Sequence, residues 1–226
     1  MSGDATRLPL VPLADLVHFP RTELRLHVID PSFEQLVHDL TALDEDSRWL
    51  GVVLLKPGWS RRSERQPEIF PGGTAARVMD LETQSDGRSN LLLHGEFRFE
   101  LERELGDVPY RQALVRPVEE PWLNERDAGV VAVRQAIVEL VRSLCEELGD
   151  KLSLDVDGLA SGDCAFEELV NRIASRVDVP PLRKLQLLTE SLPERGLSVL
   201  SILRSRRQVM DMLRPFRRLA EGSERN

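Results

Sequence analysis

Hydrophobic residues in the first half of the chain are spaced as in β-strands. Residues 24–28 alternate between apolar and polar side chains, the period-two pattern of a strand with one buried face. Residues 50–55 are continuously apolar around one glycine, as in a strand buried on both faces. Similar patterns predict further strands at residues 8–13, 16–19, 74–82, 91–101 and 110–118.

Turn and helix signals separate these strands. Pro9 and Pro12 favour an edge position for the first strand, because proline cannot donate to a ladder. Apolar residues at helical spacing follow Asp30-Pro31 and predict a helix over residues 33–43. Asp86-Gly87 indicates a hairpin turn, and Gly95 indicates a bulge or bend in its return strand.

Beyond Glu119-Glu120-Pro121 the apolar spacing becomes helical and predicts about four helices. Asn124 is a candidate cap of the first helix, and Pro215 should end or kink the last one. We expect Trp122 to pack between the two halves. The predicted fold class is therefore α+β, with a β-rich subdomain over residues 7–120, a helical subdomain over 121–220, and flexible termini at 1–6 and 221–226.

Composition narrows the classes of protein. The chain has 226 residues and 41% hydrophobic residues, and no apolar run approaches the length of a membrane-spanning helix. Its polar, acidic start lacks a secretory signal, so we expect a cytoplasmic protein with no membrane partner. A net charge of −8 disfavours nucleic acid, although seven arginines against three acids over residues 204–226 keep RNA as an alternative partner.

The sequence contains none of the common catalytic or cofactor motifs. Phosphate-binding glycine loops, the nucleophile elbow and the zinc-protease motif are absent. The four histidines are not paired at helical metal-ligand spacing, so no metal site and no cofactor is predicted. We therefore expect a protein that is not an enzyme. A small-molecule enzyme remains an alternative, and a pocket lined by His18, His27 or His94 together with acids would favour it.

The long polar segment over residues 57–71 is the candidate binding region. A segment of this length inside a compact domain is unusual and often functional. Trp59 lies within it, and an aromatic residue on a loop is a common anchor in a binding site. The predicted binding residues are Trp59, Phe70, Arg61 and Arg62, with an apolar groove near the two aromatic side chains.

Several segments, in order along the chain, resemble the N-terminal domain of Lon, the ATP-dependent protease. The resemblance covers residues 7 to 203. This sequence departs from the family at residues 57–71, which are longer and more charged, and at Gly72-Gly73, where the family has a single glycine. The similar segments are Leu8–Leu13 with Val17–Pro20, Leu26–Pro31, Gly51–Leu55, Gly73–Val78, Gly95–Phe99, Pro109-Tyr110 with Ala113–Val115, and Val179–Gln186.

The resemblance implies a twisted, partly closed PUA-like β-structure with one helix, followed by a small helical bundle. It also implies a role in selecting unfolded or tagged polypeptides, with a protease or chaperone as a further partner. Because the chain stops before the family's ATPase and protease modules, we expect a free-standing polypeptide-binding or adaptor protein of quality control. We expect it to be a monomer or a weak homo-oligomer.

Overall fold

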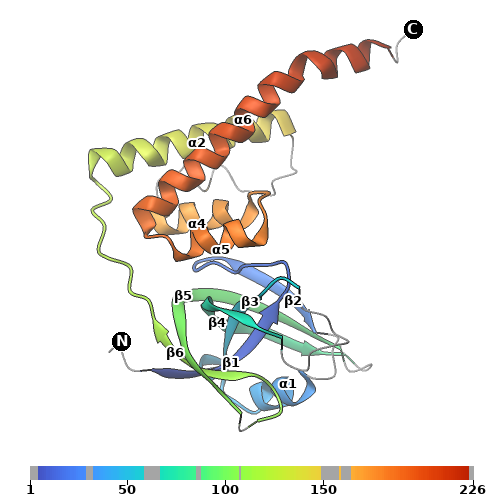
Figure 1. Ribbon diagram of the computed structural model, residues 1–226, viewed down its shortest axis with the longest axis vertical. Coiled ribbons are helices and arrows are strands. Elements are labelled where there is room, and N and C mark those ends of the chain that lie inside the picture. The colour runs from blue at the N-terminus through green and yellow to red at the C-terminus, as the bar shows by residue number, and fades with distance from the viewer. Residues whose placement is uncertain are drawn as a thin grey trace. The chain divides into compact units, whose positions relative to one another are not determined.

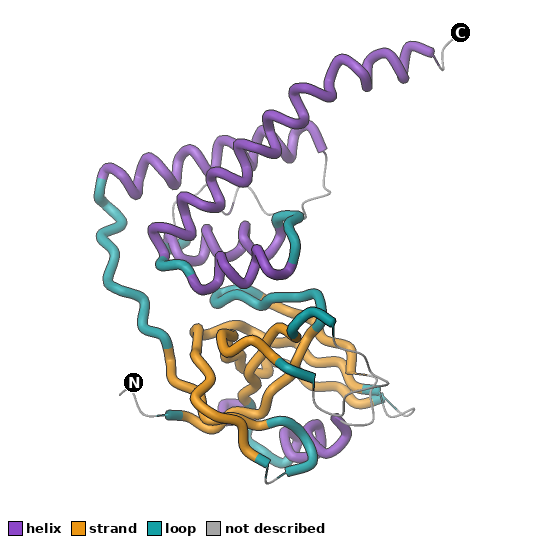
Figure 2. The backbone as a smooth tube through the Cα atoms, viewed as in Figure 1, coloured by secondary structure: helices purple, strands orange, loops and turns teal. Residues whose placement is uncertain are grey.

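The computed structural model describes residues 5–28, 33–58, 67–84, 88–106, 108–148, 158 and 164–223, and for residues 148 and 215–223 it describes the backbone alone. Strands occupy the first part of the chain and helices the last, with one early helix as the exception (Figure 2). The chain forms two compact units, Met1–Pro121 with Asp178–Glu190 and Trp122–Val177 with Ser191–Asn226.

The first unit is built on a mixed six-stranded sheet (Figure 1). The strand order is β2-β5-β4-β3-β1-β6, and β5 also pairs with β6, so five of the strands close into a ring. β1 and β3 are parallel, and the other pairs are antiparallel. This near-barrel confirms the predicted β-rich fold. The strands are β1 (Thr6–Leu13), β2 (Glu23–Val28), β3 (Trp49–Leu55), β4 (Ile69–Thr83), β5 (Ser89–Leu105) and β6 (Gln112–Pro117).

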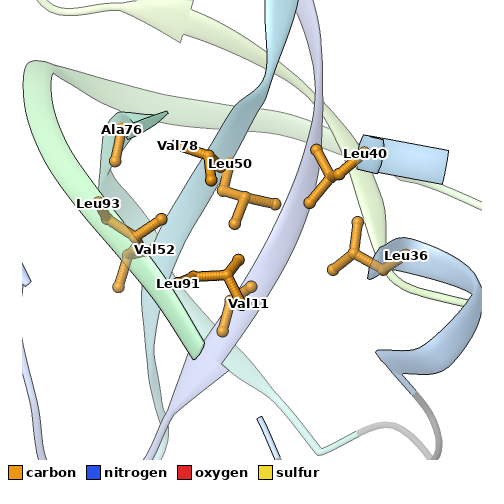
Figure 3. Packing of buried hydrophobic residues seen from close by; sticks show 9 residues of the cluster. All are labelled: Val11, Leu36, Leu40, Leu50, Val52, Ala76, Val78, Leu91 and Leu93. Atoms are coloured by element: carbon orange, nitrogen blue, oxygen red, sulfur yellow. The ribbon is translucent and has the colours of Figure 1, made fainter. Parts of the chain in front are cut away.

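One core cluster lies between the sheet and helix α1 (Glu34–Thr41), which presents Leu36 and Leu40 to it (Figure 3). A short 3-10 turn, η2 (Glu45–Ser47), leads from this helix into β3. β3 is buried from Leu50 to Leu55, as its unbroken apolar sequence predicts. The buried members of the cluster are Val11, Leu36, Leu40, Leu50, Val52, Ala76, Val78, Leu91 and Leu93.

A second cluster surrounds Phe99, which is 1% exposed. Two glycines make room for its ring. A Cβ on Gly51 would lie 3.1 Å from Phe99 Cζ, and a Cβ on Gly73 would lie 2.7 Å from it and 2.5 Å from the Val52 carbonyl oxygen. The close approach of β3, β4 and β5 therefore depends on residues without side chains.

Two strand predictions are wrong. β1 is not an edge strand, because it lies between β3 and β6. Pro9 has a register partner in β6 but none in β3, and Pro12 has one in β3 but none in β6. Each proline therefore has one side without a ladder, where a missing N–H breaks no hydrogen bond. Residues 16–19 form no strand, although Val17 and Phe19 are buried.

The predicted bulge at Gly95 is confirmed. The register of β4 with β5 shifts between Ala75 and Ala76, which pair with Phe97 and Gly95 and leave Glu96 as the extra residue. A Cβ on Gly95 would lie 2.3 Å from the Phe19 carbonyl oxygen, so only glycine allows this segment to pass.

In the described part of the chain, four helices follow the sheet, which agrees with the predicted number of about four. They are α2 (Ala128–Leu148), α4 (Phe166–Arg176), α5 (Pro181–Thr189) and α6 (Leu192–Ser223). α5 belongs to the first unit and the other three to the second. Within the second unit, Arg195 of α6 is fully buried and donates to Asn171 Oδ1 of α4 at 2.7 Å. A buried charge with such a partner ties the two helices together.

Three predictions about the helical part are not confirmed. α6 continues through Pro215 instead of ending there. α2 begins after Asp127, whose carboxylate accepts from the N–H of Gly129 at 2.8 Å, so Asp127 and not Asn124 caps it. Trp122, expected to be packed, is 85% exposed.

Candidate functional site

Of the four predicted binding residues, the structure describes Phe70 alone; Trp59, Arg61 and Arg62 lie outside the described residues. Phe70 is the second residue of β4 and is half-buried. The next residue outward, Ile69, pairs with Leu55 of β3. The predicted region therefore joins the end of β3 to the start of β4, at one end of the ring.

The two described ends of this region are bonded to each other. The N–H of Lys56 donates to the Glu68 carbonyl oxygen at 2.9 Å, and Lys56 Nζ lies 2.7 Å from Glu68 Oε2. This hydrogen bond from Lys56, with the charge behind it, holds the pKa of Glu68 below its usual range. The ion pair persists at neutral pH and keeps the start and the finish of the segment side by side.

A third contact anchors the same ends to the far strands. Arg111, just before β6, donates from Nη1 to the Pro67 carbonyl oxygen at 2.5 Å. Its Nε and Nη2 donate to the two carboxylate oxygens of Glu104 on β5, at 2.9 and 2.8 Å. A bidentate arginine of this kind fixes direction as well as distance. Hydrogen bonds and ion pairs thus connect the two described ends of the candidate binding region to each other and to β5.

The histidines are brought together only in part. His18 is 4% exposed, and burial, followed by the nearby charge of His94, lowers its pKa to about 4. His94 lies 3.3 Å from Glu96, which also faces Arg77 at 3.5 Å. His27 lies elsewhere, with Nδ1 2.7 Å from Asn90 Oδ1.

The buried member of this polar cluster is uncharged at physiological pH, because burial lowers the pKa of His18 to about 4. Within the described ranges no three His, Cys, Asp or Glu side chains are grouped as metal ligands. The pocket of histidines and acids that would favour an enzyme is not among the described cavities, which lie on the helices.

Those cavities are two hollows between α2 and α6, of about 470 and 510 Å³. Arg207 lines both, donating to Ser143 Oγ at 2.5 Å and pairing with Asp211 at 3.1 Å. Arg214 pairs with Glu147 at 2.9 Å, and this hydrogen bond holds the pKa of Glu147 below its usual range. Two of the C-terminal arginines are therefore already bound to carboxylates, which weakens the case for RNA.

One buried charged residue of the first unit cannot be predicted from the pattern of the sequence. Arg98 on β5 is 7% exposed and donates to the carbonyl oxygens of Leu188 and Glu190, at 2.7 and 3.1 Å, where α5 ends. Its Nη2 lies 2.7 Å from Glu120 Oε1. Between Phe97 and Phe99 the alternation places Arg98 on the outer face, and no local signal shows that α5 covers it.

A comparison with protein families decides the family. Residues 7–205 match the model of the "ATP-dependent protease La (LON) substrate-binding domain". The chain belongs to the Lon substrate-binding domain family. The resemblance found in the short segments is thereby confirmed over nearly the whole chain.

Relatives of this Lon domain are much longer proteins. It is 29% identical over 209 residues to a Lon protease of Anaeromyxobacter dehalogenans, covering 91% of this chain and 24% of the relative. A Lon protease of Flavobacterium johnsoniae is 23% identical over the same length, with 91% and 25% covered. The chain thus spans about a quarter of the length of these relatives.

Solved Lon domains share the fold. The N-terminal domain of Lon protease from the Mycobacterium avium complex aligns with a TM-score of 0.67 at 15% identity, covering 88% of this chain and 98% of that one. A Lon N-terminal domain protein from Xanthomonas campestris aligns with a TM-score of 0.57 at 24% identity, covering 86% and 96%. At these identities the likeness establishes the architecture alone.

None of the described helices combines the length and the sustained apolar composition of a bilayer-spanning segment.

Proposed function

We propose that this Lon domain recognises polypeptides without catalysing a reaction, acting on unfolded or tagged chains as an adaptor of protein quality control in the cytoplasm. The observation that carries the proposal is the match of residues 7–205 to a substrate-binding domain. A protease or chaperone that processes the captured chain is the further partner, and nucleic acid and membranes are not.

The contacts at the two described ends of residues 57–71 support a binding role for that region. Its ends are tied together by Lys56 and Glu68 and anchored by Arg111. A binding segment is best presented from a scaffold that does not move with it. Trp59 and Phe70 are the apolar anchors of the proposal, and Arg61 and Arg62 are its charged residues.

Fluorescence anisotropy with a labelled, permanently unfolded polypeptide tests both the function and the region. The protein should bind it, and Trp59→Ala should weaken binding about tenfold, the loss expected for a central aromatic contact. Trp122→Ala is the matched control, because Trp122 is an 85% exposed tryptophan outside the region. It should bind like the parent.

Absence of binding by the parent protein at high micromolar concentration would refute the proposed function. Equal binding by the Trp59→Ala and Trp122→Ala variants would remove Trp59 from the site and leave the function in place. A pull-down from cells of origin, followed by mass spectrometry, should recover unfolded clients together with a protease or chaperone.

A further inference from the structure

Closure of the ring leaves one strand with a single neighbour. Each of β1, β3, β4, β5 and β6 has neighbours on two sides over part of its length, whereas β2 pairs with β5 alone. Among the described residues, β2 is therefore the one strand whose outer edge is open along its whole length, and in β4 the edge away from β5 is open only over Asp80–Thr83. The ladder of β2 with β5 runs without a register shift from Glu23 to Val28. Proline and bulges, two devices that proteins use to block an edge, are absent from β2.

Backbone hydrogen bonds show which groups of β2 face outward. The N–H of Gly95 donates to the Thr22 carbonyl oxygen at 2.9 Å, and the Gly95 carbonyl oxygen accepts from the N–H of Arg21 at 2.8 Å, so both backbone groups of Gly95 face the segment that leads into β2. Along an antiparallel strand, residues that bond to a given neighbour alternate with residues that do not, so Leu93, Leu91 and Ser89 share the orientation of Gly95. Leu24, Leu26 and Val28 therefore bond to β5.

It follows that Glu23, Arg25 and His27 direct their N–H and C=O groups away from β5. The contact of His27 with Asn90 agrees, because side chains approach most closely in the pairs that exchange no backbone bonds. The open edge thus presents three donors and three acceptors at two-residue intervals, a pattern that an extended backbone matches and a helix does not.

Side chains on β2 indicate what kind of chain fits. Leu24, Leu26 and Val28 are half-buried against the core cluster, so the apolar face of the sheet reaches the edge without being fully covered. The exposed side chains of β2 are Glu23, Arg25 and His27. Because they include both an acid and a base, they do not favour a partner of one particular charge. An added strand with apolar residues at alternate positions would extend the core face, and its backbone would make the directed contacts.

We propose that β2 captures an extended segment of an unfolded polypeptide by β-strand addition. This inference rests on the proposed function and names the element and the chemistry that carry it out. Recognition through the backbone tolerates many sequences, and alternating apolar residues are accessible in chains that have not folded. A folded protein keeps its own strands paired, so β2 should not bind it.

The test uses a labelled peptide of about eight alternating Thr and Val residues with a lysine at each end, a length that spans β2. In hydrogen exchange followed by NMR, the amides of Glu23, Arg25 and His27 should exchange rapidly in the free protein and slow by about tenfold or more on binding. The amides of Leu24, Leu26 and Val28 should be slow in both states.

Two variants separate backbone from side chain at one position. Arg25→Pro removes an N–H that the β2–β5 ladder does not use, and proline is tolerated where the N–H of an edge strand faces solvent. It should weaken peptide binding by about tenfold or more, through a lost hydrogen bond and the bulk of the ring. Arg25→Ala keeps the N–H and should bind within about twofold of the parent, because an exposed charge contributes little.

A control on the peptide side needs no change in the protein. The same peptide N-methylated at two consecutive central residues has both of its edges blocked and should not bind. If Arg25→Pro fails to fold, amide protection in the parent and the methylated peptide still decide the matter.

The outcomes distinguish this inference from the proposed function. If an unfolded polypeptide binds but the amides of Glu23, Arg25 and His27 keep their exchange rates, strand addition at β2 is refuted and polypeptide binding stands. If neither the peptide nor the unfolded polypeptide binds, both are refuted. Protection of these amides without peptide, together with a dimer in size-exclusion chromatography, would assign the edge to a second copy of the chain and overturn the inference.

Discussion

At the scale of single residues, His18 makes stability depend on pH. Burial lowers its pKa to about 4 in the folded protein, against 6.5 in the unfolded chain. Well above pH 6.5 the imidazole is neutral in both states, so its titration does not make the free energy of unfolding depend on pH. Between pH 6.5 and 4 the unfolded chain gains a proton that the folded protein does not, so stability falls as the pH falls.

We expect this loss to approach about 3 kcal/mol between pH 7.5 and 4. Urea unfolding at pH 7.5, 6.5 and 5.5 measures the first part of this loss, about 1.3 kcal/mol down to pH 5.5, in the range above the titration of most carboxylates. His18→Gln should be less stable at pH 7.5 but should show a flatter dependence. The side chains facing His18 are Thr22 and His94, and His94→Gln should reduce the shift only slightly. Equal pH dependence in His18→Gln and the parent would contradict this account.

Single residues were predictable where the cause was local. Gly95 interrupts an alternating strand, and the bulge that it predicts is present. Asn124 and Asp127 are both good capping residues, and the pattern does not tell them apart because the choice depends on where the chain turns into α2. Burial of Arg98 could not be read from the sequence, since its partners are 90 and 92 residues away.

At the scale of elements, Gly72 and Gly73 of β4 differ in how much space the neighbouring strands leave for a side chain. A Cβ at Gly73 would meet the Val52 carbonyl oxygen at 2.5 Å and Phe99 at 2.7 Å, and strand backbone cannot yield as a flexible side chain can. A Cβ at Gly72 would meet only Thr189 Cγ2, at an ordinary 3.5 Å. Gly72 is therefore free of the constraint that acts on Gly73.

Gly73→Ala should lower the free energy of unfolding by about 2–3 kcal/mol, the cost of overpacking a closed core. Gly72→Ala should change it by no more than about 0.5 kcal/mol, as at other uncrowded sites. Chemical denaturation of the two variants beside the parent measures the difference. Equal destabilisation would mean that backbone conformation and not space determines the need for glycine.

Elements were predicted well where their period was clear and poorly where their neighbours mattered. The helix over α1 and the buried strand β3 follow from spacing alone. The central place of β1 in the sheet does not follow from spacing. Prolines indicate an edge strand only where the strand is paired on both sides at the proline itself, and in β1 neither proline has register partners on both sides. Pro215 did not end α6, although proline disfavours the interior of a helix.

At the scale of the molecule, the order of elements along the sequence does not show that α5 belongs to the same unit as the sheet. A boundary near Pro121 divides the strands from the helices, yet Asp178–Glu190 is grouped with the sheet. The pairing of β1 with β6, which the ring needs to close, is equally non-local, because it joins the first and the last strand of the sheet and their sequences carry no sign of their partner. Period and composition could therefore predict the class of fold but not which helix completes the first unit.

The dependence of the first unit on α5 can be tested by truncation. A chain ending at residue 121 retains the ring but loses the carbonyl oxygens of Leu188 and Glu190 that accept from Arg98. Hydrogen bonds to a charged donor contribute about 1.5–3 kcal/mol each, so residues 1–121 alone should be less stable by about 3 kcal/mol or more than a chain in which a flexible linker joins them to residues 178–190. Thermal unfolding of the two proteins gives the comparison.

The Arg98→Ala substitution in both chains tests whether α5 acts through this arginine. If it lowers the melting temperature of the linked chain and leaves that of residues 1–121 unchanged, the effect of α5 acts through Arg98. If the two chains without the substitution have the same melting temperature, the ring is complete without α5.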